Sequence, residues 1–173
     1  WNKLRGFSKI TNIPVTTTIH AMGCFDETNE LSLQFLGMHG NGAANHAIQN
    51  ADLIIAVGTR FDDRITGNIK TFAPKAFEAF KRNEGGIIHV NINSDEIDYV
   101  IKSHFNFNMD AFNFFDQLNP HLEKLDKQEW LESIKKWQDE YKFKYSKSNN
   151  LKTQQVIEEL NNYLLDNKIS KYY

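Results

Sequence analysis

Three short segments rich in β-branched or aliphatic residues stand out within residues 1–110. They are Ile13–Thr18, Leu53–Val57 and Ile87–Ile92. Such segments predict β-strands. Leu53–Val57 has no polar residue in alternation, which is typical of a strand that is buried on both faces of a parallel sheet.

Helical patterns lie between and after these segments. Ala43–Asn50, Lys75–Arg82 and Asp95–Lys102 place their apolar residues at helical spacing, and Pro74 suits the first turn of the second helix. Asp62–Asn68 is charged and predicts a loop. The alternation of strands and helices predicts an α/β fold, with a parallel sheet that has helices on both faces.

Residues 111–173 are helical in pattern. One amphipathic face repeats at i, i+4, i+7 and i+11 and consists of Trp130, Ile134, Trp137 and Tyr141. A second face consists of Val156, Ile157, Leu160, Tyr163 and Leu164. The polar segment Ser146–Asn150 predicts a linker between the two helices.

Composition and charge exclude several classes of protein. The chain has 173 residues, 40% apolar and 24% charged, which is ordinary for a globular protein. The net charge is −2, and no segment concentrates Lys and Arg without acids, so we expect no nucleic-acid partner. The longest strongly apolar run, Leu53–Val57, is too short to span a membrane. The single cysteine, Cys24, cannot form an internal disulfide and has no evident base partner.

The strongest candidate for chemistry is the glycine-rich segment Leu36–Gly42, which precedes the predicted helix Ala43–Asn50. Glycines let backbone N–H groups approach a ligand closely, and a helix N-terminus favours an anion such as phosphate. This arrangement favours a nucleotide-binding loop over a plain turn. His39 lies in the loop and is the histidine best placed to contact a ligand, whereas His89 is expected to pack beside its strand.

A second candidate is Gly58–Arg64, at the carboxyl end of the predicted strand Leu53–Val57. Ligands of open α/β sheets bind at such ends. Arg60 could hold a phosphate or stack on a planar ring. Asp62 and Asp63 could bind a metal, but a local salt-bridge cluster with the neighbouring arginines is the favoured interpretation, because two adjacent acids alone are poor metal ligands.

Asn91 lies near the end of the predicted strand Ile87–Ile92, and Asn93 follows it. Dinucleotide-binding folds place an acid at the end of a second strand, where it binds the ribose hydroxyls. An Asn side chain still accepts a hydrogen bond, although without charge. The alternative interpretation is a strand-end turn, where Asn is common for backbone reasons.

Several motifs, in order, closely resemble the catalytic subunits of the acetohydroxyacid synthase (acetolactate synthase) family. They are Ile13-Pro-Val-Thr-Thr-Thr18, Leu36-Gly-Met-His-Gly40, Gln49–Gly58, Arg60-Phe-Asp-Asp-Arg64, Thr66-Gly-Asn68 and Gly85–His89. The similarity is dense over residues 11–90 and looser to about 110. Beyond that it rests on helix positions and on Trp130 and Trp137.

The resemblance implies a protein of three α/β domains, two of which bind thiamine diphosphate and Mg²⁺ while the middle one binds FAD. Residues 1–112 would be most of this Rossmann-like FAD domain, 113–150 a helical linker, and 151–173 the start of the third domain. The family condenses pyruvate with pyruvate or 2-oxobutyrate, with loss of CO₂, in branched-chain amino acid synthesis. FAD undergoes no net redox turnover there.

The resemblance also implies partners and a location. We expect a homo-oligomer, either dimer or tetramer, a regulatory small subunit, and no membrane partner. The location would be cytoplasmic in bacteria and mitochondrial or plastid in eukaryotes, with the mitochondrion favoured. Neither the acid that activates thiamine nor the metal ligands occur in this chain, so no catalytic or metal-binding residue is expected and the chain alone is expected to be inactive.

The resemblance assigns residues to the flavin and phosphate side of the cofactor. Those beside the flavin are Thr18, Ile19, His20, Met38, His39 and Gly40, and His20 departs from the usual Gln or Met. The strand end and the following loop contribute Gly58, Arg60, Asp62, Asp63 and Arg64.

On the adenosine side, Asn91 and Asn93 stand on either side of Ile92 where the family often has acids. Asp110 matches an acid near the adenine, although Met109 replaces a glycine of the family. These departures leave the adenosine contacts as the weaker part of the resemblance.

Two other functions compete with an FAD-binding domain. A nicotinamide-dependent dehydrogenase would need a G-x-G-x-x-G turn, which the spacing of Gly37, Gly40 and Gly42 does not match, and an acid where Asn91 stands. A non-catalytic nucleotide-binding module remains the third hypothesis.

Overall fold

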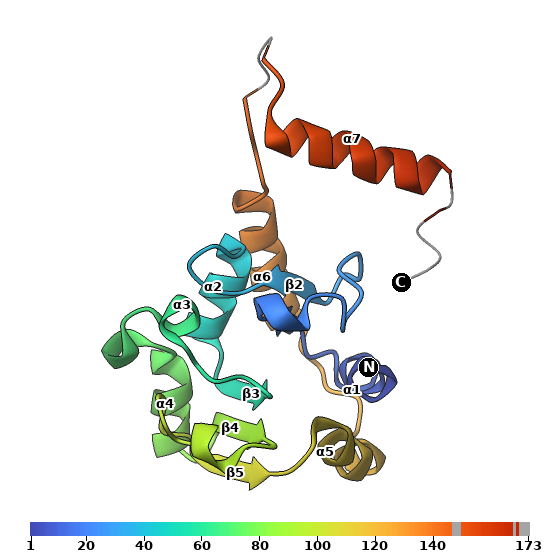
Figure 1. The fold of residues 1–173 in the computed structure, drawn as a ribbon. Coiled ribbons are helices and arrows are strands. Elements are labelled where there is room, and N and C mark those ends of the chain that lie inside the picture. Colours follow the sequence, from blue (N-terminus) through green and yellow to red (C-terminus); the bar gives the residue numbers. More distant parts are fainter. Residues whose placement is uncertain (147–149, 168, 170–173) are drawn as a thin grey trace. The chain divides into compact units, whose positions relative to one another are not determined.

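The computed structural model describes residues 1–146, 150–167 and 169. The chain divides into two compact units, Trp1–Tyr141 and Lys142–Tyr173, and each is described by itself (Figure 1). Most of the predicted linker Ser146–Asn150 lies outside the described residues. None of the described helices has the length and apolar character needed to cross a membrane.

The larger sheet of the first unit consists of three parallel strands. They are β3 (Leu53–Val57), β4 (Gly86–Asn91) and β5 (Phe105–Asn108), in the order β3-β4-β5. The predictions for the first two strands are confirmed. The third was not predicted, because its alternation of Phe and Asn lacks a β-branched run.

The smaller sheet pairs β1 (Val15–Thr17) with β2 (Ser32–Phe35), again in parallel. Helix α1 (Asn2–Thr11) precedes it and ends at Asn12, which has a left-handed φ of 56°. The predicted strand at Ile13–Thr18 is confirmed, although it is shorter than expected. The parallel sheet that the sequence predicted is thus present in two pieces.

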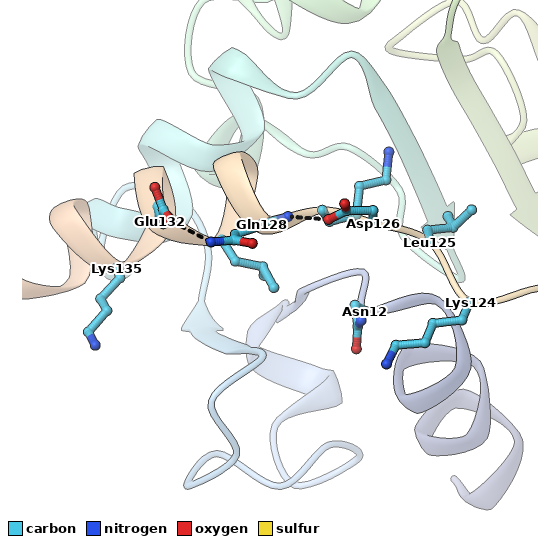
Figure 2. Close-up of a pocket in the computed structure, with 9 residues that line it drawn as sticks. Asn12, Lys124, Leu125, Asp126, Gln128, Glu132 and Lys135 are labelled. Atoms are coloured by element: carbon cyan, nitrogen blue, oxygen red, sulfur yellow. Dashed lines mark hydrogen bonds between the residues drawn. The ribbon is translucent and has the colours of Figure 1, made fainter.

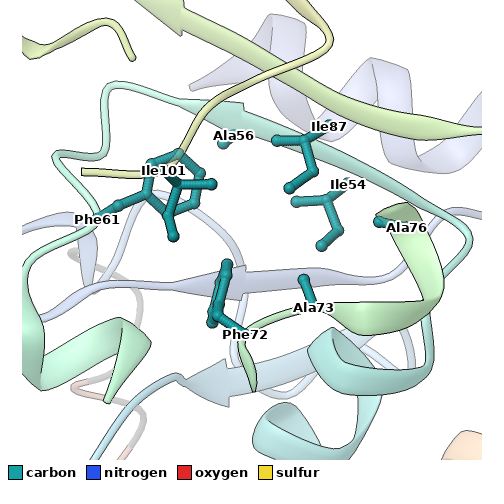
Figure 3. Close-up of a cluster of buried hydrophobic side chains, with 8 residues drawn as sticks. All are labelled: Ile54, Ala56, Phe61, Phe72, Ala73, Ala76, Ile87 and Ile101. Carbon is teal, nitrogen blue, oxygen red and sulfur yellow. The ribbon is translucent and has the colours of Figure 1, made fainter. Parts of the chain in front are cut away.

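One face of the larger sheet packs against α4 (Pro74–Lys81) and the residues just before it (Figure 3). The cluster consists of Ile54, Ala56, Phe61, Phe72, Ala73, Ala76, Ile87 and Ile101. Burying a large aliphatic or aromatic side chain contributes about 1.5–3 kcal/mol, so this cluster stabilises the sheet substantially.

The opposite face of the same sheet packs against α1 and α5 (Ala111–Leu118). Val90 of the sheet lies in a buried cluster with Phe7 of α1 and with Phe114 and Phe115 of α5. Successive strand residues therefore point to opposite faces, and each face meets a helix. The prediction of a parallel sheet with helices on both faces is confirmed.

Leu53–Val57 is less completely buried than its composition suggested. Leu53, at its start, is 39% exposed, whereas Ile54 is 6% exposed. The strand lies at the edge of its three-stranded sheet. An edge position leaves part of an apolar strand open, even in a parallel sheet.

Two other predictions of local structure were wrong. The predicted loop Asp62–Asn68 contains the short helix α3 (Asp63–Thr66). The predicted helix at Asp95–Lys102 is only a 3-10 turn, η3 (Ser94–Glu96), and the chain then turns at Asp98, which has a left-handed φ of 59°. The other 3-10 turns are η1 (Ile19–Ala21), η2 (Ile69–Thr71) and η4 (Asn119–His121).

Helices α2 (Gly42–Asn50) and α6 (Gln128–Glu140) pack together beside β2, and both were predicted. Ile134 of α6 is 2% exposed and lies against Ala44 and Ala47 of α2. Residues up to Tyr141 therefore belong to the first compact unit. The domain boundaries expected at 112 and 150 stay a prediction.

The second unit contains α7 (Thr153–Asp166), which confirms the second predicted amphipathic helix. Tyr145 donates a hydrogen bond to the Glu158 carboxylate, and Lys152 Nζ lies 2.7 Å from Ser146 Oγ. The apolar face of α7 is largely open, since Ile157 is 62% exposed.

Candidate functional site

The predicted site residues follow the carboxyl ends of the five described strands. They are Thr18–His20 after β1, Met38–Gly40 after β2, Gly58–Arg64 after β3, Asn91 and Ile92 at the end of β4, and Asp110 after β5. Ligands of open parallel sheets bind at these ends. The fold therefore gathers segments that are far apart in the sequence at the ligand-binding ends of the strands.

Backbone hydrogen bonds join the first two of these segments. Leu36 N donates to Thr17 O at 2.9 Å, so the end of β1 lies beside the start of the glycine-rich loop. Thr18 is the residue before η1, and the two residues after it, Ile19 and His20, are exposed. Ile19, at 62% exposed, offers an open apolar surface next to the loop.

Two asparagines fix the shape of the glycine-rich loop. Asn45 of α2 accepts the Gly37 N–H at Oδ1 (3.0 Å) and donates from Nδ2 to Gly37 O (2.9 Å). Asn41 caps α2, because its Oδ1 accepts the Ala43 N–H at 2.8 Å. Neither asparagine was predicted from the sequence, although Asn is a common residue before a helix.

The three glycines of the loop allow close contacts within the chain itself. A Cβ at Gly37 would stand 2.4 Å from Arg64 O, and one at Gly40 would stand 2.3 Å from Phe35 O. A Cβ at Gly42 would stand 2.5 Å from the ring of Tyr141, which lies beside the N-terminus of α2. The spacing of these glycines is explained by packing, and it is no longer an argument for a phosphate cradle.

The glycine-rich loop and the segment after β3 lie side by side. Met38 N donates to Arg64 O at 2.7 Å, on the same carbonyl that Gly37 approaches. The Met38 side chain is 68% exposed, and His39 next to it is also exposed. The two candidate segments of the sequence thus form one continuous surface.

Asp62 is the N-cap residue of the short helix α3. Its Oδ1 accepts the N–H groups of Arg64 (3.1 Å) and Ile65 (3.2 Å), so it caps α3. Arg60 lies 3.9 Å from Asp62, and its side chain is 60% exposed. An exposed ion pair of this length is weak, which leaves the guanidinium free to bind an anion.

Asp62 and Asp63 are the two adjacent acids for which the sequence left a metal site open. Asp63, beside Asp62, is exposed. Among the described residues, no group of three His, Cys, Asp or Glu side chains is placed to hold a metal ion.

Phe61 combines an unusual backbone conformation with a buried ring. Its φ is 54°, a left-handed value that is rare for a bulky residue. The ring is 3% exposed and lies edge-on to Phe72 (5.8 Å between centroids) and His89 (5.0 Å). The unusual backbone conformation buries this ring while Arg60 stays on the surface.

The carbonyl of Thr59 is held by two side chains of β4. It lies 2.9 Å from His89 Nε2 and 3.2 Å from Asn91 Nδ2. His89 is fully buried, as expected. Asn91 is 6% exposed, and its Oδ1 accepts the Asn93 N–H at 3.0 Å, so both its polar atoms are used within the chain.

Ile92, the first residue after β4, is 72% exposed. Asn108, the last residue of β5, donates from Nδ2 to the carbonyls of Asn91 and Ile92, both at 3.0 Å. Asp110 is exposed and caps α5 by accepting the Phe112 N–H at 2.7 Å. Hydrogen bonds therefore join the ends of β4 and β5 beside Asp110, the residue that was predicted to lie near the adenine.

A groove of about 490 Å³ lies elsewhere, between the end of α1 and the start of α6 (Figure 2). Its lining mixes charges of both signs and consists of Asn12, Lys124, Leu125, Asp126, Lys127, Gln128, Leu131, Glu132 and Lys135. None of the predicted site residues lines this groove.

Cys24 is not an activated nucleophile. Its side chain is buried, at 6% exposed, and burial raises the pKa of the thiol above its ordinary value. A raised pKa lowers the fraction of reactive thiolate at neutral pH.

Comparison with known proteins places these features in context. The model for the central domain of thiamine pyrophosphate enzymes matches residues 1–118. The chain is 42% identical over 161 residues to the mitochondrial acetolactate synthase catalytic subunit of Saccharomyces cerevisiae, covering 91% of this chain and 23% of that protein. The resemblance found in the motifs is confirmed.

Acetolactate synthases of other organisms show the same similarity. Mitochondrial acetolactate synthase of Schizosaccharomyces pombe is 40% identical over 171 residues, 95% of this chain and 26% of that protein. A probable acetolactate synthase large subunit of Methanocaldococcus jannaschii is 39% identical over 135 residues, 76% of this chain and 21% of that protein. The chain spans about a quarter of the length of these relatives.

Proposed function

Since the chain belongs to the family of thiamine pyrophosphate enzyme central domains, we propose that it is the FAD-binding part of an acetolactate synthase catalytic subunit. The relatives that match over most of the chain are named as acetolactate synthases. The observation that supports FAD binding is the position of the candidate residues, which follow all five described strands on connected loops.

The exposed groups on this surface fit the parts of FAD. Ile19, Met38 and Ile92 are each more than half exposed, and such open apolar side chains suit a planar ring. Arg60 offers a weakly paired guanidinium for the diphosphate. Gly58 has a φ of 69°, and no atom lies within 4 Å of the position of a Cβ, so its backbone is open to a ligand.

In this proposal, Met38 and Ile19 contact the flavin, Arg60 binds the diphosphate, and Ile92 and Asp110 lie towards the adenosine. FAD supplies a planar aromatic surface next to the reaction and undergoes no net redox change. The part played by this chain is to bind and orient the cofactor and to exclude water from one side of the active site.

The whole protein would condense two 2-oxo acids, pyruvate with pyruvate or with 2-oxobutyrate, with loss of CO₂, in branched-chain amino acid synthesis. Thiamine diphosphate and Mg²⁺ would be held by residues outside this chain. We infer a homo-oligomer with a regulatory small subunit. A mitochondrial location is supported by the fungal relatives, which are named as mitochondrial.

Titration with FAD, followed by quenching of flavin fluorescence, tests the proposal. We expect saturable binding of FAD and none of a nicotinamide dinucleotide. Arg60→Gln should weaken FAD binding about tenfold, which is the effect of losing one charge-assisted hydrogen bond.

Arg82→Gln is the matched control, because Arg82 is also an exposed arginine beside an acid, Glu84, but lies at the end of α4. Binding of nicotinamide without flavin would favour a dehydrogenase domain. Binding of neither dinucleotide would favour a non-catalytic module.

A further inference from the structure

We propose that His89 is a positioning residue for the FAD-binding segment Gly58–Arg64. His89 does not reach the surface, since it is fully buried. It acts through the carbonyl of Thr59, the residue immediately before Arg60. The inference rests on the proposed function, because it gives His89 a role in the site that the proposal assigns to FAD.

A hydrogen bond between the His89 ring and the Thr59 carbonyl positions the segment. His89 Nε2 lies 2.9 Å from Thr59 O, and a carbonyl oxygen only accepts, so Nε2 must carry the proton. Nδ1 of the same ring has no hydrogen-bond partner in the structure. One nitrogen of a fully buried imidazole is thus committed to one backbone atom of the segment.

The position of this bond matters because Phe61, two residues after Thr59, has a strained backbone conformation. Phe61 has a left-handed φ of 54°, and such a conformation persists only where surrounding contacts hold it. His89 supplies two of these contacts, the bond to Thr59 O and the edge-on packing against the Phe61 ring. Arg60 lies between the two residues that His89 contacts, so His89 fixes the path of the backbone on both sides of it.

Asn91 provides a second side-chain hydrogen bond to the Thr59 carbonyl. Its Nδ2 lies 3.2 Å from the same carbonyl, while its Oδ1 is occupied by the Asn93 N–H. Gly58 N donates to Val90 O at 2.8 Å, which ties the start of the segment to the same strand. His89 supplies the shorter of the two side-chain contacts to the Thr59 carbonyl.

Two substitutions of similar volume separate the hydrogen bond from packing. His89→Gln keeps an N–H donor at about the reach of Nε2, whereas His89→Met fills similar space without a donor. His104→Met is the matched control, because His104 Nδ1 also bonds the backbone of β4, at Ile87 N (2.8 Å), near the amino end of the strand. All three variants are compared in the full protein after their folded fraction is checked by thermal unfolding.

Two measurements then apply. Hydrogen–deuterium exchange of the peptide covering residues 58–64 reports the order of the segment without any cofactor. Flavin titration reports the dissociation constant for FAD. We expect His89→Met to speed exchange in this peptide and to raise the FAD dissociation constant about tenfold, with His89→Gln within about threefold of the parent and His104→Met unchanged in both.

The inference is overturned if exchange in residues 58–64 is the same in His89→Met as in the parent, or if His89→Gln is as impaired as His89→Met. It is also overturned if the exchange changes but the FAD dissociation constant does not. A parent protein that binds no FAD overturns the proposed function instead, and the exchange data still decide whether His89 orders the segment.

Discussion

Gly37 is the residue at which the glycine-rich loop meets the segment after β3. It combines a φ of +112° with a contact that leaves no room for a Cβ, which would stand 2.4 Å from Arg64 O. Gly67 also has a positive φ, +57°, but nothing lies within 4 Å of its Cβ position. An alanine at Gly37 would meet both backbone strain and a steric clash, whereas an alanine at Gly67 would meet backbone strain alone. Comparing the two substitutions therefore separates the two effects.

Gly37→Ala should lower the free energy of unfolding by about 2–4 kcal/mol, because left-handed strain and overpacking both contribute. Gly67→Ala should cost only the backbone strain, about 1–3 kcal/mol, since Gly67 has a φ of 57° and a ψ of −119°. Urea unfolding of both variants gives the comparison. Equal losses would show that Arg64 moves aside without cost, so that the junction of the two loops is not rigid.

His104 makes the stability of the fold depend on pH. Its Nδ1 accepts the Ile87 N–H, its ring stacks on Phe80 at 4.0 Å, and burial lowers the pKa of the imidazole below its ordinary value of 6.5. The unfolded chain then binds a proton at a higher pH than the folded chain does. Stability is fully present above pH 6.5 and falls as the pH drops from 6.5 through the lowered pKa of the folded state.

The measurement is the free energy of unfolding in urea at a series of pH values on either side of 6.5. His104→Gln keeps an acceptor for Ile87 N but does not titrate, so its curve should be flatter below pH 6.5. The aspartates with lowered pKa, Asp26 and Asp98, are bonded by Thr28 and Ser103, and they titrate only in more acidic solution. An unchanged slope in the glutamine variant would assign the pH dependence to another group.

Residues that hold the candidate site were the hardest to predict. Asn45, Asn91 and His89 act by bonding backbone atoms, and His89 and Thr59 are 30 positions apart. Such bonds leave no local pattern in the sequence. The exposed residue Met38 was predicted because it belongs to a motif shared with a known family, whereas Arg60 was also predicted from its place at the carboxyl end of a buried parallel strand.

At the level of elements, helix α6 contacts α2 at its middle and at its C-terminal end. Ile134 fills the middle of the contact, and Tyr141 lies beside Gly42, with its ring stacked on His46 at 4.8 Å between centroids. A Cβ at Gly42 would stand 2.5 Å from the Tyr141 ring, so the ring fills the space that a side chain at residue 42 would need. The helix N-terminus that the sequence suggested for phosphate is instead a packing surface.

A double-mutant cycle tests this contact. Gly42→Ala should cost about 1–3 kcal/mol through overpacking, and Tyr141→Ala should cost a similar amount through lost packing. The double variant should lose less than the sum, because removing the ring makes room for the methyl group. Strict additivity of the two losses would show that the residues do not share this space.

The strands and helices were predicted where one pattern dominated. Leu53–Val57 and Ile87–Ile92 are rich in aliphatic residues and formed strands, and the apolar faces around Ile134 and Leu160 formed helices. The helix expected at Asp95–Lys102 failed because Ile97, Val100 and Ile101 can also reach the core from a turn. Asp98 stabilises that turn by accepting the Ser103 N–H at 2.7 Å.

On the scale of the whole molecule, the candidate surface covers one side of a site at most. Its apolar side chains Ile19, Met38 and Ile92 and the side chain of Arg60 are each more than half exposed. The chain spans about a quarter of the length of its relatives. Under the proposed function, the catalytic groups come from outside this chain.

The chain alone should form no acetolactate from pyruvate when thiamine diphosphate, Mg²⁺ and FAD are all supplied. The measurement is the colorimetric assay for acetoin after acid treatment, with the acetolactate synthase catalytic subunit of Saccharomyces cerevisiae as the positive control. Product formation by the chain would show that it holds catalytic groups of its own.

The contact between Gly42 and Tyr141 also constrains how related sequences diverge. The family match ends at residue 118, whereas Tyr141 lies 23 positions further on, yet it occupies the space that a side chain at 42 would need. A lineage that acquires a larger residue at 42 should carry a smaller one at 141, and the two changes should be inherited together. Shortened versions of the chain that stop at the family boundary would lose this neighbour and leave the start of α2 uncovered.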